Sequence, residues 1–457
     1  MPRAQLTDDQ ILDEGEKLFL ERAKAYYREL RQVAQNAPIG KIINRADAFA
    51  FEKGRELVQQ SLECIVQEQN DILEKKKELR ECNCGRKRRH LGYRTHHTLT
   101  SVGKVKTKRL YCGCFVCDIN VHPTDDLVGI EDDYTVGLRD LAVYCAAEGS
   151  FAKAEQRLKK LCGISLSENT IKMLCDKESV KIEQWQKTDP RAALPFQHSY
   201  GELEFTTDGT MINTLKGWRE VCIGIFSRRE LGRFALPQEW ETRHLPRPHI
   251  SVAFAAMEDK DTFRRRWTSW AYRLKIKDQL DTMSTLGDGA HWIWDASKLA
   301  FGKTKETLDI YHALENLSNC GKVLYKPESP EFDAWQEKTK WLLLEEGYDG
   351  IHGYLEQRIA WQRGEPQKAG VEDTKLKALE RVDGYLKWHK ERLNYRERLS
   401  EGRAIGSGQV EGACKYLIGA RLKQTGARWR DDRVNKMGII CPLFYTEQWN
   451  EYWKQAK

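Results

Sequence analysis

The sequence lacks the features that would assign it to a membrane or to the secretory route. It has no N-terminal apolar segment of the kind that a signal peptide needs, and no apolar run approaches the length of about 18 residues that indicates a transmembrane helix. No internal repeat or low-complexity segment is evident. We therefore expect a soluble, cytoplasmic protein with no membrane partner. A chain of 457 residues is long enough for about two to four domains.

The cysteines do not suit a disulfide framework, because thirteen is an odd number in a long chain without a signal peptide. Five of them fall within residues 82–117, in two close-spaced clusters that flank a strand-like stretch at residues 99–107. This is the layout of a zinc ribbon, in which two thiolate-bearing turns hold one tetrahedral ion. The predicted ligands of a structural Zn²⁺ are Cys82, Cys84, Cys114 and Cys117, with Cys112 as the spare. The first pair is Cys-x-Cys instead of the usual Cys-x-x-Cys, and the alternative is a set of free thiols in a small β-hairpin.

Acidic residues are absent from the same segment, which carries nine Lys or Arg residues. The net charge of the whole chain is only +7, so the basic charge is concentrated here instead of spread evenly. A second basic patch, with an aromatic in it, lies near the C-terminus. Both patches suit contacts with the phosphates of nucleic acid. The candidate DNA-binding residues are Arg86, Lys87, Arg88, Arg89, Arg421, Lys423, Arg428 and Arg430.

Helical patterns dominate the rest of the first half. Residues 8–34 and 49–81 read as two amphipathic helices, for which packing or self-association is the expected role. Residues 138–185 predict helices with a break at 162–164 and a new helix capped by Ser167. This pattern fits a DNA-binding helix-turn-helix, and it fits an ordinary helical hairpin equally well.

A mixed α/β core is predicted from residue 202 onward. Residues 202–226 read as two strands joined by a turn at 215–217, and a third strand follows at residues 250–257. Asp208 stands in the first strand before Gly209, and Asp288 follows a short strand in the same Asp-Gly arrangement. The segment at 328–400 is wholly helical in pattern, which indicates an all-α insertion.

The helix that follows Ser407 carries Glu411 and, one turn later, Lys415. Two strand-end aspartates and this glutamate would make an oxygen-rich ligand set of the kind that Mg²⁺ or Mn²⁺ prefers. Two such ions can activate the attacking oxygen and stabilise the leaving oxygen of a phosphodiester. The alternatives are turn residues for Asp208 and Asp288, and a surface charge paired with Lys415 for Glu411.

These motifs together resemble a known family of enzymes. Asp208 in TTDGT followed by GWREVCIGIF, Asp288 in LGDGAHWIW, the Asp309-x-x-His312 pair, and Glu411 in IGSGQVEGACKYLIGARLKQTGARW resemble a DDE transposase of bacterial insertion sequences. The nearest group is the ISKra-type, and the resemblance covers roughly residues 80–440. It implies an RNase H-like catalytic domain with an all-α insertion before the glutamate. It also implies a metal-binding triad of Asp208, Asp288 and Glu411, with His312 beside the active site.

The expected function is therefore a transposase that binds the ends of an insertion sequence and performs DNA cleavage and strand transfer with two Mg²⁺ or Mn²⁺ ions. Its partners would be double-stranded DNA, as terminal inverted repeats and as target, and a second copy of the chain in a homodimer on DNA. The alternatives are a catalytically silent, domesticated DNA-binding protein and an RNase H-like nuclease that does not join strands.

The expected fold class is α/β, with an RNase H-like mixed sheet, an all-α insertion, a helical N-terminal region, a zinc ribbon and a helix-turn-helix. The expected domains are an N-terminal helical region (1–81), a zinc-ribbon module (82–117), a helix-turn-helix-like domain (118–195), the first part of the catalytic core (196–327), the insertion (328–402), and the last core helices with a basic segment (403–457).

Overall fold

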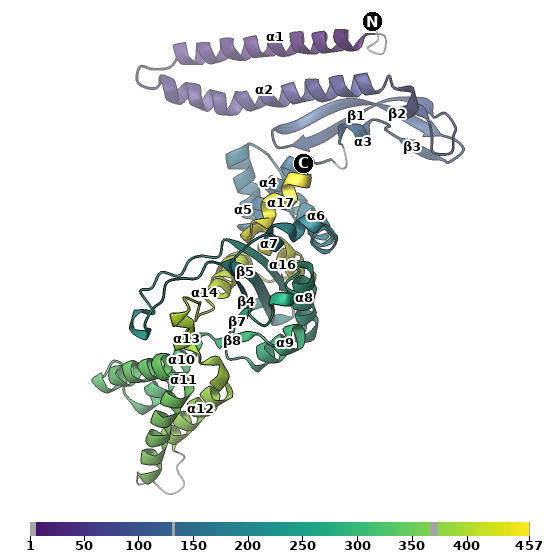
Figure 1. Cartoon of the computed structure of the whole chain (residues 1–457). Helices are drawn as coiled ribbons and strands as arrows, with labels where there is room; N and C mark the ends of the chain where they lie inside the picture. The colour runs from purple at the N-terminus through teal and green to yellow at the C-terminus, as the bar shows by residue number, and fades with distance from the viewer. Residues whose placement is uncertain (1–5, 130–132, 366–372, 457) are drawn as a thin grey trace. The chain divides into compact units, whose positions relative to one another are not determined.

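A computed structural model of the chain describes residues 6–129, 133–365 and 373–456 (Figure 1). The parts of the predicted domains at residues 1–5, 130–132, 366–372 and 457 lie outside the described residues. The chain divides into two compact units, one that extends to Glu178 and one that runs from Ser179 to Gln455. The mixture of helices and sheets that an α/β protein requires is confirmed.

The first unit begins with a helical hairpin. Helices α1 (Asp8–Gln35) and α2 (Ile42–Leu73) lie side by side (Figure 1). Thr7 starts α1 with a capping box, because its hydroxyl accepts from the Gln10 amide while the Gln10 side chain accepts from the Thr7 amide. The second helix was predicted at residues 49–81, but α2 begins and ends earlier than that. Residues 77–80 form a 3₁₀ turn instead.

The three-stranded antiparallel sheet of the first unit packs against α2. Its strands are β1 (Arg89–Thr100), β2 (Gly103–Cys114) and β3 (Ile119–Val121). The strand-like stretch expected at 99–107 contains the turn between β1 and β2, in which the Thr100 hydroxyl donates to the Gly103 carbonyl. Glu74, the C-cap residue of α2, accepts from the Leu110 amide at 2.9 Å, which fixes the end of the helix against the sheet.

Short helices complete the first unit: α3 (Asp125–Val128), α4 (Val136–Ala147), α5 (Phe151–Cys162) and the start of α6 (Glu168–Thr188). The predicted break after α5 is confirmed, since Gly163 adopts a left-handed φ of 63° that favours glycine. The predicted cap is confirmed as well, since the Ser167 hydroxyl accepts from the Thr170 amide.

The second unit is built on a five-stranded sheet in the order β6-β5-β4-β7-β8. Strand β5 pairs antiparallel with both β4 and β6, whereas β7 pairs parallel with β4, and β8 pairs parallel with β7. The turn predicted between the first two strands is confirmed. The strands are β4 (Glu202–Thr214), β5 (Gly217–Arg229), β6 (Ile250–Ala256), β7 (Ser284–Gly287) and β8 (Lys305–Leu308).

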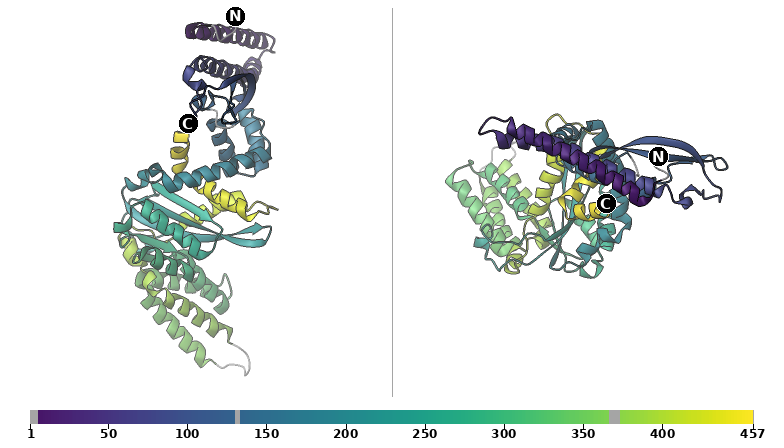
Figure 2. Two further views of the ribbon diagram at one scale, coloured as in Figure 1. Left: turned by 90° about the vertical axis from the view of Figure 1, so that its right-hand side faces the viewer. Right: turned by 90° about the horizontal axis from the view of Figure 1, so that it is seen from above.

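The alternation of side chains along β4 gives this sheet two different faces. Phe205 faces an aromatic cluster that includes Phe226, Trp267 and Phe301, which come from β5, α8 (Lys260–Arg273) and α9 (His291–Phe301). The C-terminal helix α16 (Asp431–Tyr445) lies alongside the sheet (Figure 2), and it approaches β6 so closely that a Cβ at Gly438 would meet the Ala255 carbonyl at 2.8 Å.

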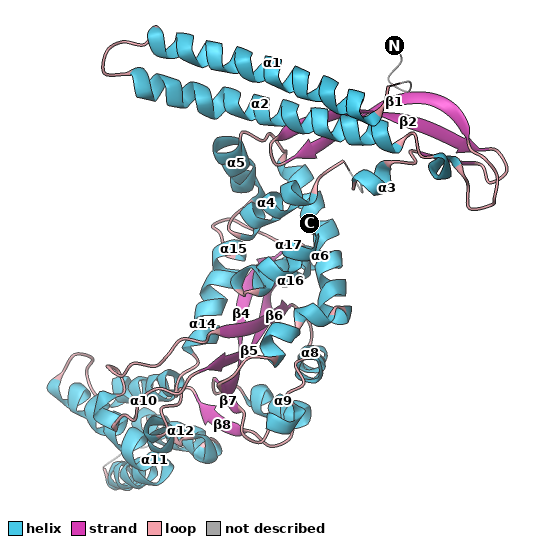
Figure 3. Cartoon of the chain, turned by 45° about the horizontal axis from the view of Figure 1, so that its top comes forward, coloured by secondary structure: helices cyan, strands magenta, loops and turns pink. Residues whose placement is uncertain are grey.

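The segment expected to be an all-α insertion is helical throughout its described part (Figure 3). Long helix α11 kinks at Gly347, and Trp335, Leu343 and Leu379 belong to the apolar cluster that joins α10, α11 and α12. The remaining elements of the second unit are α7 (Leu194–Gln197), α10 (Ile310–Leu324), α11 (Pro330–Gly364), α12 (Thr374–Trp388), α13 (Tyr395–Ser400), α14 (Gly408–Ala413), the π-helix η7 (Cys414–Gly419), α15 (Ala420–Leu422), α16 (Asp431–Tyr445) and α17 (Gln448–Ala456). Among the described residues, no helix combines the length and the apolar character that crossing a membrane requires.

Candidate functional site

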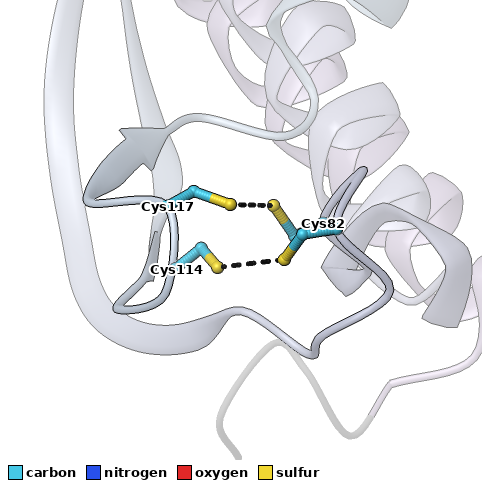
Figure 4. Close-up of side chains that lie close together, drawn as sticks. Cys82, Cys114 and Cys117 are labelled. Carbon is cyan, nitrogen blue, oxygen red and sulfur yellow. Dashed lines mark hydrogen bonds between the residues drawn. The ribbon is translucent and has the colours of Figure 1, made fainter.

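The four cysteines predicted as metal ligands meet in the first unit (Figure 4). Their sulfur atoms all lie within 4.8 Å of one another, with 3.8 Å between Cys82 and Cys117 and 3.7 Å between Cys84 and Cys114. Four thiolates at about 2.3 Å from a tetrahedral zinc ion would stand about 3.8 Å apart. The cluster can therefore hold a metal ion such as zinc, and both its chemistry and its spacing fit.

Local structure explains why the Cys-x-Cys spacing suffices. The Cys82 amide donates to the Arg86 carbonyl, and the Gly85 amide donates to the Cys82 carbonyl, so the chain turns tightly between the first two ligands. The amide of Cys84 and the neighbouring thiols lower the pKa of the Cys82 thiol to about 6, which favours the thiolate that binds metal. Cys112 lies outside the cluster, and burial raises its pKa.

In the second unit, the register of the sheet brings Asp208 and Asp288 together. Strands β4 and β7 pair in parallel from Glu204 opposite Ser284 to Thr206 opposite Leu286, a constant offset of 80 residues. Asp208 and Asp288 have the same offset and stand two residues beyond the last of these pairs. Asp208 is therefore not at a strand end as predicted, because β4 continues to Thr214 through its pairing with β5. The Asp288 carboxylate accepts from the Ala290 amide at 2.7 Å, and the Asp288 carbonyl accepts from the buried Trp294 indole.

The electrostatics of Asp208 show that charged neighbours surround it. Burial raises the pKa of its carboxyl group, and the nearby negative charge of Asp288 raises it further. The Gly209 amide, the Cys414 thiol and His312 act in the opposite direction. Asp288 and His312 thus both lie near Asp208, and a cation placed between the two aspartates would offset their repulsion.

Glu411 lies on a helix that packs against β4, but its carboxylate points elsewhere in this structure. It forms an ion pair with Lys415 at 2.7 Å and is 55% exposed. Cys414, three residues further along, contacts Asp208 through its thiol at 3.5 Å. Within the described residues, the cysteine cluster is the group close enough to hold a metal, and the three carboxylates do not form such a group.

Asp309 links the two segments that carry the predicted site. It is 3% exposed and starts α10, where its carboxylate accepts from the amides of Tyr311 and His312. Its other oxygen accepts from both the amide and the hydroxyl of Ser407, so Ser407 stands at the N-cap position of α14 without capping it through its side chain. Asp309 therefore fixes the start of the helix that bears Glu411.

The sequence did not indicate that the insertion would reach the Asp288 loop. Tyr385 of α12 lies so close that a Cβ at Gly289 would meet its hydroxyl at 2.3 Å. His389 is fully buried beside Tyr385 and Trp294, and burial lowers its pKa to about 3. No residue spacing in the sequence signals this contact, whereas Cys414 could have been found from its position three residues after Glu411.

The basic residues beside the cysteine cluster differ in how far they are exposed to solvent and in whether they bond to the rest of the chain. Arg86 and Lys87 are exposed in the turn before β1. Arg89 is exposed and stacks over Phe115 at 5.0 Å. Arg88 is half-buried and donates to the Leu79 carbonyl at 3.2 Å, so it serves the local fold as well.

The second basic patch is bonded to the turn between β4 and β5, where Trp429 exchanges backbone hydrogen bonds with Asn213 and Leu215. Its predicted DNA contacts Lys423, Arg428 and Arg430 are exposed, although Arg430 also pairs with Asp432. Arg421 is a correction to the predicted interface. It is 1% exposed and packs over the Trp429 ring, because its aliphatic stem and flat guanidinium suit an aromatic neighbour in the interior.

No protein-family model matches the chain, and no curated protein matches it.

Proposed function

We propose that this protein is a DNA transposase of the DDE type, the family that its motifs resemble. Asp208, Asp288 and Glu411 would be the ligands of two Mg²⁺ or Mn²⁺ ions. The observation that carries the proposal is the parallel register of β4 and β7, which sets Asp208 beside Asp288. Burial and, to a lesser extent, the charge of Asp288 raise the pKa of Asp208. When bound, the ions would activate the attacking oxygen and stabilise the leaving oxygen of a phosphodiester.

The sheet of the second unit supports the RNase H-like core that the resemblance implies. Three sequential antiparallel strands are followed by two strands parallel to the first, with β4 at the centre. The two aspartates come from β4 and from the end of its parallel neighbour β7.

The position of Glu411 supports its role as third ligand once metal is present. In a helix, residues three apart share a face, so the contact between Cys414 and Asp208 places Glu411 one turn from the aspartates. The π-helix that begins at Cys414 is an uncommon element that occurs frequently at functional sites. For this role the Glu411 side chain must rotate away from Lys415 and toward the two aspartates.

The ion pair between Glu411 and Lys415 favours a second candidate function. If that pair persists with metal and DNA present, the chain would be a catalytically silent DNA-binding protein. The two candidates differ in one experiment, which offers DNA carrying the element's own ends with Mg²⁺, with Mn²⁺ or with chelator. The transposase should nick this DNA and join it to a target only with metal, whereas the silent protein should bind it and leave it intact.

The cysteine cluster has a structural role in this proposal, with Zn²⁺ bound to Cys82, Cys84, Cys114 and Cys117. We expect about one zinc per purified chain, because metal binding supplies folding free energy to a small module. Cys117→Ser should lose the metal and loosen residues 82–121, while Cys112→Ala should keep it, since Cys112 lies outside the cluster. Elemental analysis and amide hydrogen exchange measure both effects. Disulfides among these cysteines, or equal metal loss in both variants, would contradict this assignment.

DNA binding should depend steeply on salt, because the exposed cations would displace counterions from several phosphates. For six or more contacts, affinity should fall about a thousandfold or more between about 50 and 200 mM salt. Neutralising Arg86, Lys87 and Arg89 together should reduce both the affinity and this slope. The matched control neutralises the exposed Lys387 and Lys390 of the insertion and should change neither. Titrations by fluorescence anisotropy provide the measurement, and a flat salt response would rule out DNA as the main partner.

A further inference from the structure

The α1–α2 hairpin exposes a large amount of apolar surface. An amphipathic helix normally buries one apolar stripe, yet in the described chain Ile11 is the one fully buried residue of α1 and Asn70 that of α2. Ten large apolar side chains of the two helices are instead more than a third exposed, and eight of them remain when Leu18 and Ile42 are set aside. These eight are Leu12, Phe19, Leu20, Tyr27, Ile43, Phe51, Val58 and Ile65, which we call the hairpin face.

These side chains recur at intervals of seven residues, as in a helix that packs along its length against another. Phe51, Val58 and Ile65 form such a series on α2, and Leu12 with Phe19, like Leu20 with Tyr27, forms a shorter one on α1. Such spacing keeps side chains on one side of a helix over several turns. The exposed residues are therefore a continuous stripe on each helix.

Both stripes lie on the same side of the hairpin, away from the sheet. Residues 59, 63 and 67 of α2 bond to β2, and α2 meets α1 through Phe49 and Cys64. Viewed along each helix from its N-terminus, the exposed stripe is rotated by about a third of a turn from the side that faces the other helix. The rotation has the same direction in both helices. Because antiparallel helices are related by a two-fold axis, equal offsets place both stripes on one face.

The hairpin is also strongly polarised in charge. Residues 8–16 and 56–73, at its open end, carry nine acidic residues and no basic one, a net charge of −9. Residues 17–55, at its closed end, carry nine basic and four acidic residues, a net charge of +5. Lys75 offsets part of the acidic end by pairing with Asp8. Two such hairpins attract one another when the open end of one lies against the closed end of the other.

We propose that the hairpin face is a dimer interface whose occupant is the same face of a second copy, in antiparallel orientation. The two hairpins form a four-helix bundle with α1 against α1 and α2 against α2, related by a two-fold axis. This arrangement buries both stripes and places the acidic half of each α1 opposite the basic half of the other. The dimer forms without DNA and does not depend on the chemistry of the second unit.

The first test measures the mass of the full-length protein by light scattering in the micromolar range. Wild type should be a dimer, and the variant Phe51→Glu/Val58→Glu/Ile65→Glu should be a monomer with unchanged helix content and metal content. Leu299→Glu is the control, because Leu299 is an exposed apolar residue of α9 outside the hairpin face, and it should remain dimeric. A monomeric wild type, as expected if another part of the same chain covers the face, or a dimeric triple variant, would overturn the proposal.

The second test uses charge reversal and leaves every apolar residue in place. One variant carries Asp13→Lys and Glu16→Lys in the acidic half of α1, and the other carries Lys24→Glu and Arg31→Glu in the basic half. Each alone should dissociate more readily than wild type, whereas a mixture of the two should form heterodimers, and a chain with all four changes should dimerise again. Failure of the mixture and of the fourfold variant to recover would exclude the antiparallel arrangement.

Discussion

Asp208→Ala, Asp288→Ala and Glu411→Ala should each reduce DNA nicking and strand transfer at least about a thousandfold, because a two-metal site that loses one ligand can no longer stabilise both reacting oxygens. Double variants should be little worse than single ones, since ligands that act as a unit are not additive. Affinity for DNA should stay within a few-fold of wild type. The measurement is single-turnover cleavage of DNA carrying the element's ends, in Mg²⁺ and in chelator.

The structure selects the control for this series. Glu204 is buried in an ion pair with Arg229, and Glu202 pairs with Arg403, so their removal would disturb the fold. Asp295 is exposed on α9, and Asp295→Ala should retain activity. Loss in Asp295→Ala with full activity in Glu411→Ala would mean that the third ligand is misassigned, and activity that survives chelation would exclude metal catalysis.

The same series predicts a stability effect with a defined sign. The folded-state pKa of Asp208 is raised by burial and by Asp288, so the folded protein holds that proton more tightly than the unfolded chain does. Stability associated with Asp208 is therefore present at low pH and is lost as the pH rises through the raised pKa. Metal-free Asp208→Asn should melt at or above the wild-type temperature at neutral pH, and added Mg²⁺ should stabilise only the wild type.

Asp309→Ala should be among the most destabilising single substitutions in the second unit, costing about 3–5 kcal/mol of unfolding free energy. The Asp309 carboxylate accepts from the backbone of Tyr311 and His312 and from two groups of Ser407, and alanine would leave these buried donors unpaired. Activity should fall as well, because the start of the helix that carries Glu411 would no longer be fixed. Chemical denaturation followed by tryptophan fluorescence measures the change.

A graded control accompanies this variant. Ser407→Ala removes one hydroxyl bond and keeps the backbone amide bond, so it should cost only about 1 kcal/mol. Asp309→Asn retains an acceptor and should fall between the two. If Asp309→Ala destabilises no more than Ser407→Ala, Asp309 does not fix the two segments to one another.

Much of the local structure follows from the sequence, because caps, breaks and strand patterns act over a few residues. Gly163 ends α5 where its left-handed φ is needed, and the Thr214–Gly217 turn joins two strands whose alternation is plain in the sequence. The four cysteines that cluster could also be chosen from spacing alone. Their selection over Cys112 is confirmed by the cluster, and the two Asp-Gly motifs already pointed to Asp208 and Asp288.

Other features were decided only by tertiary packing, since they depend on residues distant in the chain. Arg421 looks like a surface cation in sequence, but the fold places Trp429 over it and buries it. Asp309 and Ser407 are 98 residues apart, on either side of the insertion, and meet only in the folded chain. The sequence determined which side chains can bind metal and phosphate, while the register of β4 with β7 and the packing of the Glu411 helix decided which of them lie together, because close approach is a property of the folded chain.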